Sequence, residues 1–194
     1  MNTGAEFVMK HMILLLCIVV LLSGCEKKTD AMDLALQFRQ TILSSEACAF
    51  DAKITADYGN TCYEFCMNCV LQKDGSLIFT VNEPQSINGI SGEIGEMGGQ
   101  LKFDDVALAF PLLADEQLSP ICGPWILMKT LRNGFITSAG IVDQKTRLII
   151  EDSYQEDTLT THIWLQEGME PLWGEIYHNG YRILTIQLEN FEIL

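Results

Sequence analysis

Cys62, Cys66 and Cys69 lie close together in the chain, with the spacing C-x3-C-x2-C. Thiolates at such short separations can hold an iron–sulfur cluster or a zinc ion, and exported thiols can form disulfides. They can also be side chains of a strand with no chemical role. The directions in which the three side chains point decide between these interpretations.

The residues around the cysteines predict two antiparallel strands, 47–58 and 61–72. The even positions of the first strand are mostly apolar and several odd positions are charged, which is typical of a half-buried strand. Gly59-Asn60 fits a two-residue hairpin turn. With Tyr58 opposite Thr61, apolar residues face one another in the pairs Ala56–Tyr63, Ile54–Phe65, Ala52–Met67 and Phe50–Cys69. A slip of one residue would break every pair.

A second turn supports the same register. Residues 73–75, Lys-Asp-Gly, suit a three-residue loop in which Gly75 takes the left-handed conformation. The strand that follows then places Leu77, Phe79 and Val81 opposite Leu71, Cys69 and Met67. Both turns predict one shared inner face, formed by Tyr63, Phe65, Met67, Cys69 and Leu71.

With this register Cys69 points inwards, whereas Cys62 and Cys66 point outwards. The two outer thiols would lie roughly 13 Å apart at a rise of about 3.3 Å per residue. Bonds of about 2.3 Å from sulfur to a metal cannot bridge such an arrangement. The motif also departs from the iron–sulfur site of radical S-adenosylmethionine enzymes, which usually has an aromatic residue where this chain has Asn68. The sequence therefore predicts no metal site and no cofactor.

The N-terminus predicts a bacterial lipoprotein. Lys10 precedes the apolar run 12–22, which is long enough for a signal peptide but short for a membrane span. The run ends in Leu22-Ser23-Gly24-Cys25, which resembles a lipobox, and an ordinary transmembrane anchor is the alternative. We expect a signal peptide over residues 1–24, a lipidated tether over 25–30 and one domain over 31–194. Lipidation of Cys25 would anchor the protein to the outer face of the cell membrane.

Five thiols remain once the signal peptide is removed and Cys25 is acylated, and an odd number cannot all pair within one chain. They are Cys48, Cys62, Cys66, Cys69 and Cys122. A disulfide stays open as an alternative because export permits oxidation. Small apolar side chains in a reducing or anaerobic habitat are the preferred interpretation.

The charge of the chain excludes one class of partner. The formal net charge is −14, and removing residues 1–24 takes away one acid, Glu6, and one base, Lys10, so it stays at −14. Such an acidic chain has no basic stripe for nucleic acid or for anionic lipid headgroups. The lipid on Cys25 would have to provide the attachment to the membrane.

The remaining pattern predicts an α+β fold. One helix is expected over 30–43, with Asp30 as its N-cap, and a helical insertion begins at Pro120 or Pro124 and ends at Gly134. About ten strands surround the insertion, the later ones at 86–94, 98–110, 135–143, 146–154, 158–166, 171–178 and 181–194. Short connections make the sheet antiparallel, and a sheet of this size curls. We expect an incomplete β-barrel whose concave side is covered by the two helices.

Three segments carry a resemblance to a known family. They are 82–108, 118–136 and 168–193, which contain a proline–strand–glycine stretch, a helix opened by Ser-Pro and a final hairpin ending in Asn-Phe. Together they resemble the lipoprotein carriers and receptors of the LolA, LolB and LppX type, and most of all the clostridial GerS-like spore-germination lipoproteins. The resemblance implies a hollow that binds acyl chains, or a lipoprotein that binds a partner such as a cell-wall amidase.

No residues form a recognisable catalytic motif. His162 and His178 are expected to be structural, and Glu175 to lie at the rim of the hollow or to point into it. The informative residues are apolar, and they line the concave face either as plain core or as a ligand pocket: Phe50, Ile54, Tyr63, Phe65, Met67, Phe79, Val81 and Trp125.

The sequence therefore favours a non-enzymatic, membrane-anchored binding or adaptor lipoprotein. Its role would lie in sporulation and germination or in envelope biogenesis, through a cell-wall enzyme. The alternative is a carrier or receptor for a lipid or acyl compound held in the hollow.

Overall fold

The computed structural model describes residues 30–103, 106–114, 117–153, 158–166 and 170–194. The expected signal peptide, Cys25 and the tether up to residue 29 lie outside these residues. The helical elements are α2 (Ala31–Ser44), η1 (Gln85–Ile87), η2 (Pro120–Cys122) and α3 (Gly123–Asn133). No helix in the described part of the chain is long and apolar enough to cross a membrane.

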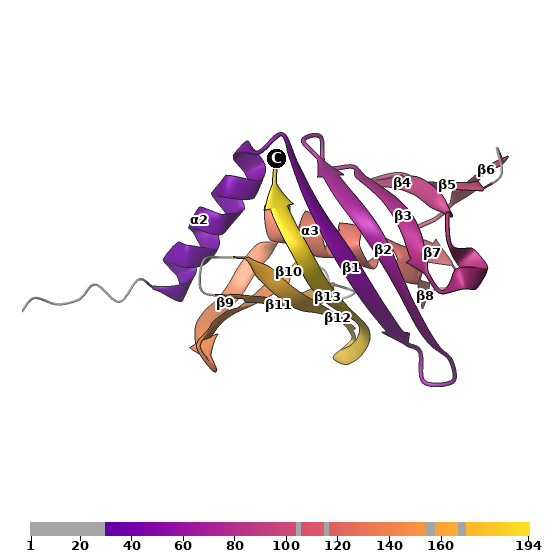
Figure 1. The fold of residues 1–194 in the computed structure, drawn as a ribbon. Coiled ribbons are helices and arrows are strands. Elements are labelled where there is room, and N and C mark those ends of the chain that lie inside the picture. Colours follow the sequence, from indigo (N-terminus) through magenta and orange to yellow (C-terminus); the bar gives the residue numbers. More distant parts are fainter. Residues whose placement is uncertain (1–29, 104–105, 115–116, 154–157, 167–169) are drawn as a thin grey trace, which may run out of the picture.

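Eleven strands form one antiparallel sheet that wraps around α3 without closing (Figure 1). They are β1 (Ala47–Asp57), β2 (Cys62–Gln72), β3 (Leu77–Glu83), β4 (Ser91–Gly95), β5 (Gly98–Phe103), β6 (Val106–Phe110), β9 (Phe135–Val142), β10 (Lys145–Glu151), β11 (Leu159–Leu165), β12 (Pro171–His178) and β13 (Tyr181–Ile193). A separate two-stranded ribbon is formed by β7 (Leu113–Ala114) and β8 (Gln117–Leu118). The predicted α+β fold, a curled and open antiparallel sheet with two helices, is confirmed.

The order of strands in the large sheet is β6-β5-β4-β3-β2-β1-β13-β12-β11-β10-β9. Neighbours in the sheet are neighbours in the sequence at every step except one, where β1 pairs with β13. This pairing joins the N-terminal and C-terminal halves of the sheet. The two free edges are β6 and β9.

The predicted register of β1, β2 and β3 is confirmed. Ala56 pairs with Tyr63, and Phe50 with Cys69, which in turn pairs with Phe79 in β3. Gly75 has φ +92°, the left-handed conformation expected of it. Burial alternates along β2 from Phe65 onwards because one face of the strand lies on the core.

The prediction for residues 98–110 was wrong in one respect, because this segment forms two strands and not one. Gly99 to Phe103 in β5 pair with Val106 to Phe110 in β6, with Phe103 opposite Val106. The sequence does indicate this hairpin. Apolar residues occupy odd-numbered positions before the turn, at Leu101 and Phe103, and even-numbered positions after it, at Val106 and Leu108. The strand expected at 86–94 is also shorter, because η1 precedes β4. The sheet therefore has eleven strands where about ten were expected.

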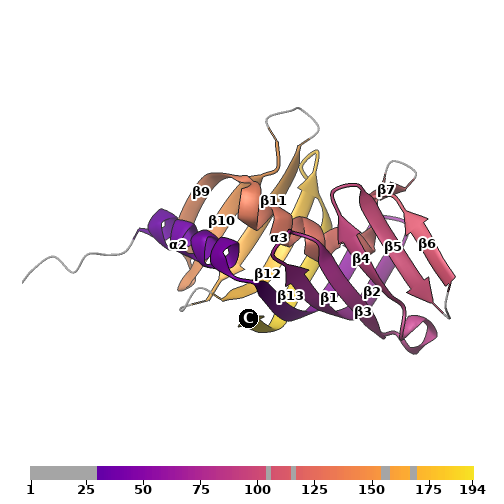
Figure 2. The ribbon, with the colours of Figure 1, turned by 90° about the horizontal axis from the view of Figure 1, so that it is seen from above.

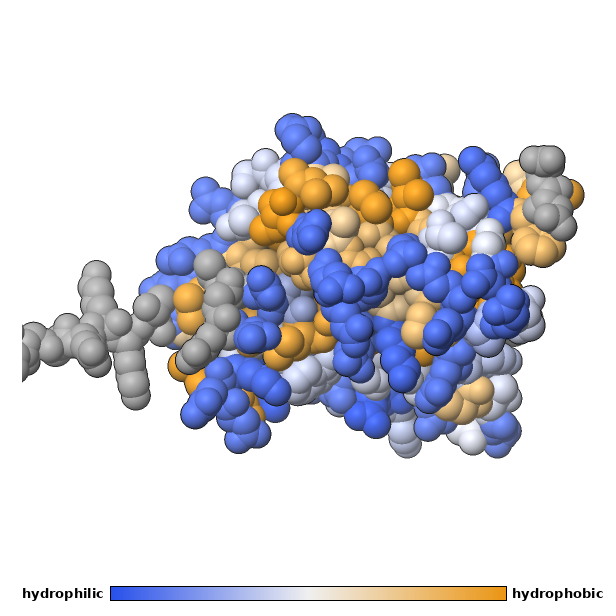
Figure 3. All heavy atoms as spheres, viewed as in Figure 1, coloured by the Kyte–Doolittle hydropathy of each residue, from blue (hydrophilic) through white to orange (hydrophobic). Residues whose placement is uncertain are grey.

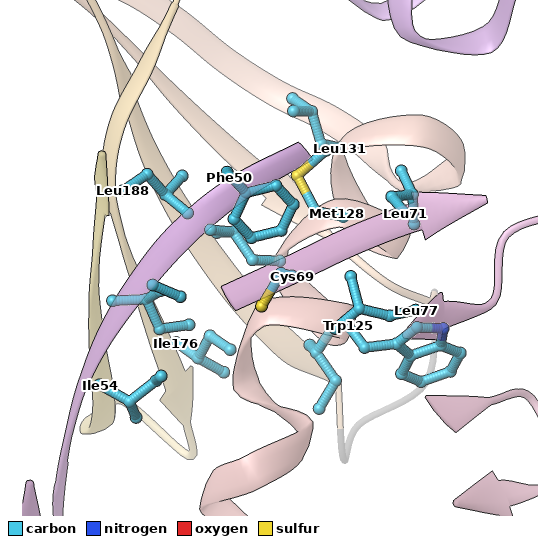
Figure 4. Packing of buried hydrophobic residues seen from close by; sticks show 14 of the residues in the cluster. Phe50, Ile54, Cys69, Leu71, Leu77, Trp125, Met128, Leu131, Ile176 and Leu188 are labelled. Carbon is cyan, nitrogen blue, oxygen red and sulfur yellow. The ribbon is translucent and has the colours of Figure 1, made fainter. Parts of the chain in front are cut away.

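The helix α3 occupies the hollow of the sheet, and its start at the Pro120 turn and end before Gly134 agree with the prediction. Gly174 on β12 allows the helix to approach closely, because a Cβ there would lie 2.2 Å from Cδ1 of Leu127. The helix α2, with Asp30 as its N-cap, packs against β9, β10 and α3 (Figure 2). The buried side chains of both helices join those of the sheet in one core (Figure 4).

Candidate ligand-binding cavity

The three clustered cysteines do not converge on a common point. Cys69 is buried in the core, whereas Cys62 is exposed and Cys66 is partly exposed on the other side of β2. All five described thiols are free, and in the described ranges no three His, Cys, Asp or Glu side chains are placed to hold a metal ion. The alternating directions of β2, predicted from the register, account for this separation.

We expect the thiols to differ in reactivity. Burial raises the pKa of Cys122 to about 12 and raises the pKa of Cys69 further, so neither forms a thiolate near neutral pH. Cys62 is exposed and should react first with Ellman's reagent at pH 8, while Cys69 and Cys122 react only after unfolding in urea. Mass spectrometry of alkylated peptides identifies the order of labelling, and early labelling of Cys69 would contradict the register.

The structure places most of the eight apolar candidates in the packed core and away from any open cavity. Phe50, Ile54, Phe65, Met67, Phe79 and Val81 are buried among other apolar side chains. Tyr63 is 50% exposed, because it lies near the end of β2 beyond the cover of the helices. Trp125 is the one member of the set that also borders a large cavity.

That cavity has a volume of about 1070 Å³ and lies at one end of the molecule. The segments around it are α3, the turn after β1, the start of β11 and the β12–β13 hairpin. Its apolar wall is formed by Leu112, Leu118, Trp125, Ile126, Leu159 and Ile183, and its polar rim includes Asp57, Lys129, Asp152, His178 and Arg182. An apolar wall with a few polar groups at the mouth is typical of sites for small amphiphilic ligands.

One polar group in the wall has no partner. Thr130 is 2% exposed, and its Oγ1 makes no hydrogen bond to any described residue. A buried hydroxyl without a partner costs about 1–3 kcal/mol. The oxygen itself is buried, so it is not open to the cavity, and Thr130 contributes to the wall through other atoms.

Tyr58 links the cavity wall to the sheet by a hydrogen bond. Its hydroxyl donates a hydrogen bond to the carbonyl oxygen of Leu118, which ties the segment before α3 to the end of β1. Burial, together with the neighbouring Cys122 and Tyr63, raises the pKa of Tyr58 to about 12. The hydroxyl therefore stays protonated and able to donate at physiological pH.

The sequence missed the position of this cavity. It placed the hollow over the middle of the sheet, but α3 fills that region through Leu127, which lies against Gly174. The free space is instead beside Ile126 and Thr130, which lie on one side of α3 four residues apart. A threonine at this spacing from an isoleucine is the only sequence signal for the site, and it is a weak one.

The polar candidates lie in two different places. His178 is at the rim of the cavity. Glu175 does not point into the hollow, because its neighbours Gly174 and Ile176 take the inner positions on β12. On the outer face it accepts hydrogen bonds from Tyr177 and Arg182. His162 lies there too, beside the rings of Trp164 and Tyr177, and burial lowers its pKa.

The chain is similar in fold to several solved structures. The LolA superfamily protein from Nitrosomonas europaea has 8% identity and a TM-score of 0.45, over 86% of this chain and 94% of that chain. Lipoprotein LppX from Mycobacterium tuberculosis has 8% identity and a TM-score of 0.39, over 81% and 94%. A chain in the structure of the CwlD amidase from Clostridioides difficile in complex with the GerS lipoprotein has 12% identity and a TM-score of 0.40, over 88% and 100%.

These similarities concern the fold alone. No protein-family model and no curated protein matches the sequence. The function must therefore be argued from the residues of this chain.

Proposed function

We propose that the protein is a membrane-anchored lipoprotein that binds an acyl compound in the cavity beside α3, without catalysing a reaction on it. The observation that carries the proposal is the cavity of about 1070 Å³, whose wall is mainly apolar. An apolar wall of this size suits an acyl chain. The mouth carries basic and acidic groups, Lys129, His178 and Arg182 beside Asp57 and Asp152, which suit a polar head.

The proposed anchor is the cysteine of the lipobox-like sequence. Acylation of Cys25 would hold the protein on the outer face of the cell membrane. A protein fixed in this way acts as a receptor or local binder, since it cannot carry its ligand through the aqueous phase.

The replacement Ile183→Trp tests the cavity. Ile183 is half-buried in the cavity wall, so an indole ring there should fill space that an acyl chain would occupy. Affinity for the fluorescent fatty acid cis-parinaric acid should fall by roughly tenfold or more, a loss of about 1.4 kcal/mol for each factor of ten.

Thr80→Trp is the matched control, because Thr80 is exposed on β3 and does not border the cavity. It should leave the affinity unchanged. Native mass spectrometry of protein released from membranes should show a bound lipid that the Ile183 variant loses. If the folded wild-type protein neither binds the probe nor retains a lipid, the proposal is wrong.

A second function, an adaptor for a cell-wall enzyme such as an amidase, is favoured by strand β6. This strand is a free edge of the sheet, and Val106 and Leu108 are 57% and 62% exposed. Unpaired backbone groups beside exposed apolar side chains can add a strand from a partner. Binding of a purified cell-wall amidase that is lost on Leu108→Lys, with cis-parinaric acid binding unchanged, would support this role.

A further inference from the structure

A row of aromatic and basic side chains lies on the outer face of β10, β11 and β12, away from the cavity. The rings of Trp164 and Trp173 are stacked across the two strands, with centroids 4.7 Å apart and planes 17° apart. The ammonium group of Lys145 lies 4.7 Å from the centroid of the Trp173 ring. Both tryptophans are only partly buried, so part of this surface is open to its surroundings.

The row continues to the free edge of the sheet. Val142 pairs with Lys145 at the end of β9, so it lies on the same outer face. Val142 is 42% exposed. We call the surface formed by Val142, Lys145, Trp164 and Trp173 the β9 corner. Contiguous exposed apolar and aromatic side chains of this kind mark contact surfaces.

The β9 corner lies at the end of the molecule where the chain enters the domain. The helix α2 begins at Ala31 and packs along β9 and β10, and both views place its N-terminal end beside β9 (Figures 1 and 2). Cys25 precedes Ala31 by only six residues. A chain of that length spans at most roughly 20 Å when fully extended. A lipid on Cys25 would therefore hold this end of the domain close to the bilayer.

We propose that the β9 corner rests in the headgroup layer of the membrane to which Cys25 is anchored, a proposal that depends on the acylation of Cys25. Tryptophan rings are favoured at this depth of a bilayer, and lysine can keep its stem in the apolar layer while its charge reaches water. The exposed side chain of Val142 at the tip adds apolar area that is removed from water.

The charges around the β9 corner indicate that it contacts the membrane through aromatic rings and apolar atoms. Lys145 and Arg147 are the bases here, and Asp143 and Glu170 lie at the neighbouring strand ends, so the local charges balance. The whole chain carries −14, which opposes attraction to anionic lipids. The contact should therefore form on uncharged phosphatidylcholine and resist salt. In Figure 3 hydrophobic side chains gather in the upper middle of the face, near the end of β13, and hydrophilic side chains surround them.

Tryptophan fluorescence in vesicles tests the proposal. Full-length lipidated protein is reconstituted into phosphatidylcholine vesicles with or without brominated acyl chains, which quench tryptophan at short range. The Trp125→Phe variant retains the two tryptophans of the β9 corner, and we expect brominated lipid to reduce its emission by roughly twofold, as for rings at the interface. The Trp164→Phe/Trp173→Phe variant retains only Trp125, which borders the cavity, so its emission reports an acyl chain in the cavity and not the corner contact.

Flotation of the same vesicles tests the acylation of Cys25 separately from the membrane contact of the β9 corner. Protein that fails to float shows that Cys25 is not acylated, which overturns the proposed anchoring and the corner contact with it. Protein that floats while brominated lipid leaves the emission of the Trp125→Phe variant unchanged overturns the corner contact alone. Quenching that disappears in 1 M salt also overturns it, because the contact would then be electrostatic. A dimer in detergent that the Trp164→Phe/Trp173→Phe variant cannot form would show that a second copy covers the corner instead.

Discussion

Replacing Leu127 by alanine is expected to lower the free energy of unfolding by about 3 kcal/mol. Leu127 is fully buried on the face of α3 that enters the hollow of the sheet. Its removal leaves a cavity at the contact between α3 and β12, where the side chain lies against Gly174. Leu36→Ala on the exposed side of α2 is the control, and it should cost less than about 1 kcal/mol. Urea denaturation followed by circular dichroism measures both values.

The same contact predicts a coupling between two replacements. Gly174→Ala alone should destabilise the protein by about 1–3 kcal/mol, because its Cβ would lie 2.2 Å from Cδ1 of Leu127 and the leucine would have to move. In the double variant the new methyl group enters the space that Leu127→Ala leaves. The double variant should then be more stable than the sum of the two single effects, by about 1 kcal/mol or more. Strict additivity would show that α3 does not pack on β12 through this pair.

Replacing Trp125 by alanine is expected to cost about 3–5 kcal/mol, the range for large aromatic side chains in cores. Trp125 is 2% exposed, and its indole Nε1 donates a hydrogen bond of 3.0 Å to the carbonyl oxygen of Gly75 in the β2–β3 turn. Lys129 lies 4.9 Å from the centroid of the Trp125 ring. The side chain therefore joins α3 to a turn of the sheet and forms part of the wall of the large cavity.

Trp125→Phe separates these roles. Phenylalanine keeps most of the buried area but cannot donate to Gly75, so the loss should be about 1–2 kcal/mol. Affinity for cis-parinaric acid should fall more in Trp125→Ala than in Trp125→Phe, because alanine removes the apolar wall. Circular dichroism, which does not depend on tryptophan emission, reports the stability of both variants. Equal stability of wild type and Trp125→Ala would contradict the buried position of this ring.

The sequence predicted the fold well where local rules determine it. The turns at Gly59-Asn60 and at Gly75 fixed the register from Phe50 to Leu77, because a shift of one residue would have turned the apolar face outwards. The same register separated Cys69 from Cys62 and Cys66. Asp30 was sufficient to predict the start of α2, and Gly134 the end of α3, because capping residues act within one turn of the helix end.

The cavity could not be predicted in this way, because it depends on how deeply α3 sits in the sheet. That depth is determined by Gly174 and Leu127, which are far apart in the sequence. Leu159 and Ile183 have the same apolar alternation as core residues, so no pattern distinguishes the cavity wall from the core. The outer row at Trp164 and Trp173 was missed for a related reason, since alternation alone does not say which outer side chains stack.

The pairing of β1 with β13 has a consequence for biogenesis. The first strand of the domain gains its second neighbour only from the last strand, so one edge of β1 stays open until the end of the chain has been synthesised. Contacts between such distant segments also form slowly. The large sheet can therefore be completed only after β13 has been synthesised.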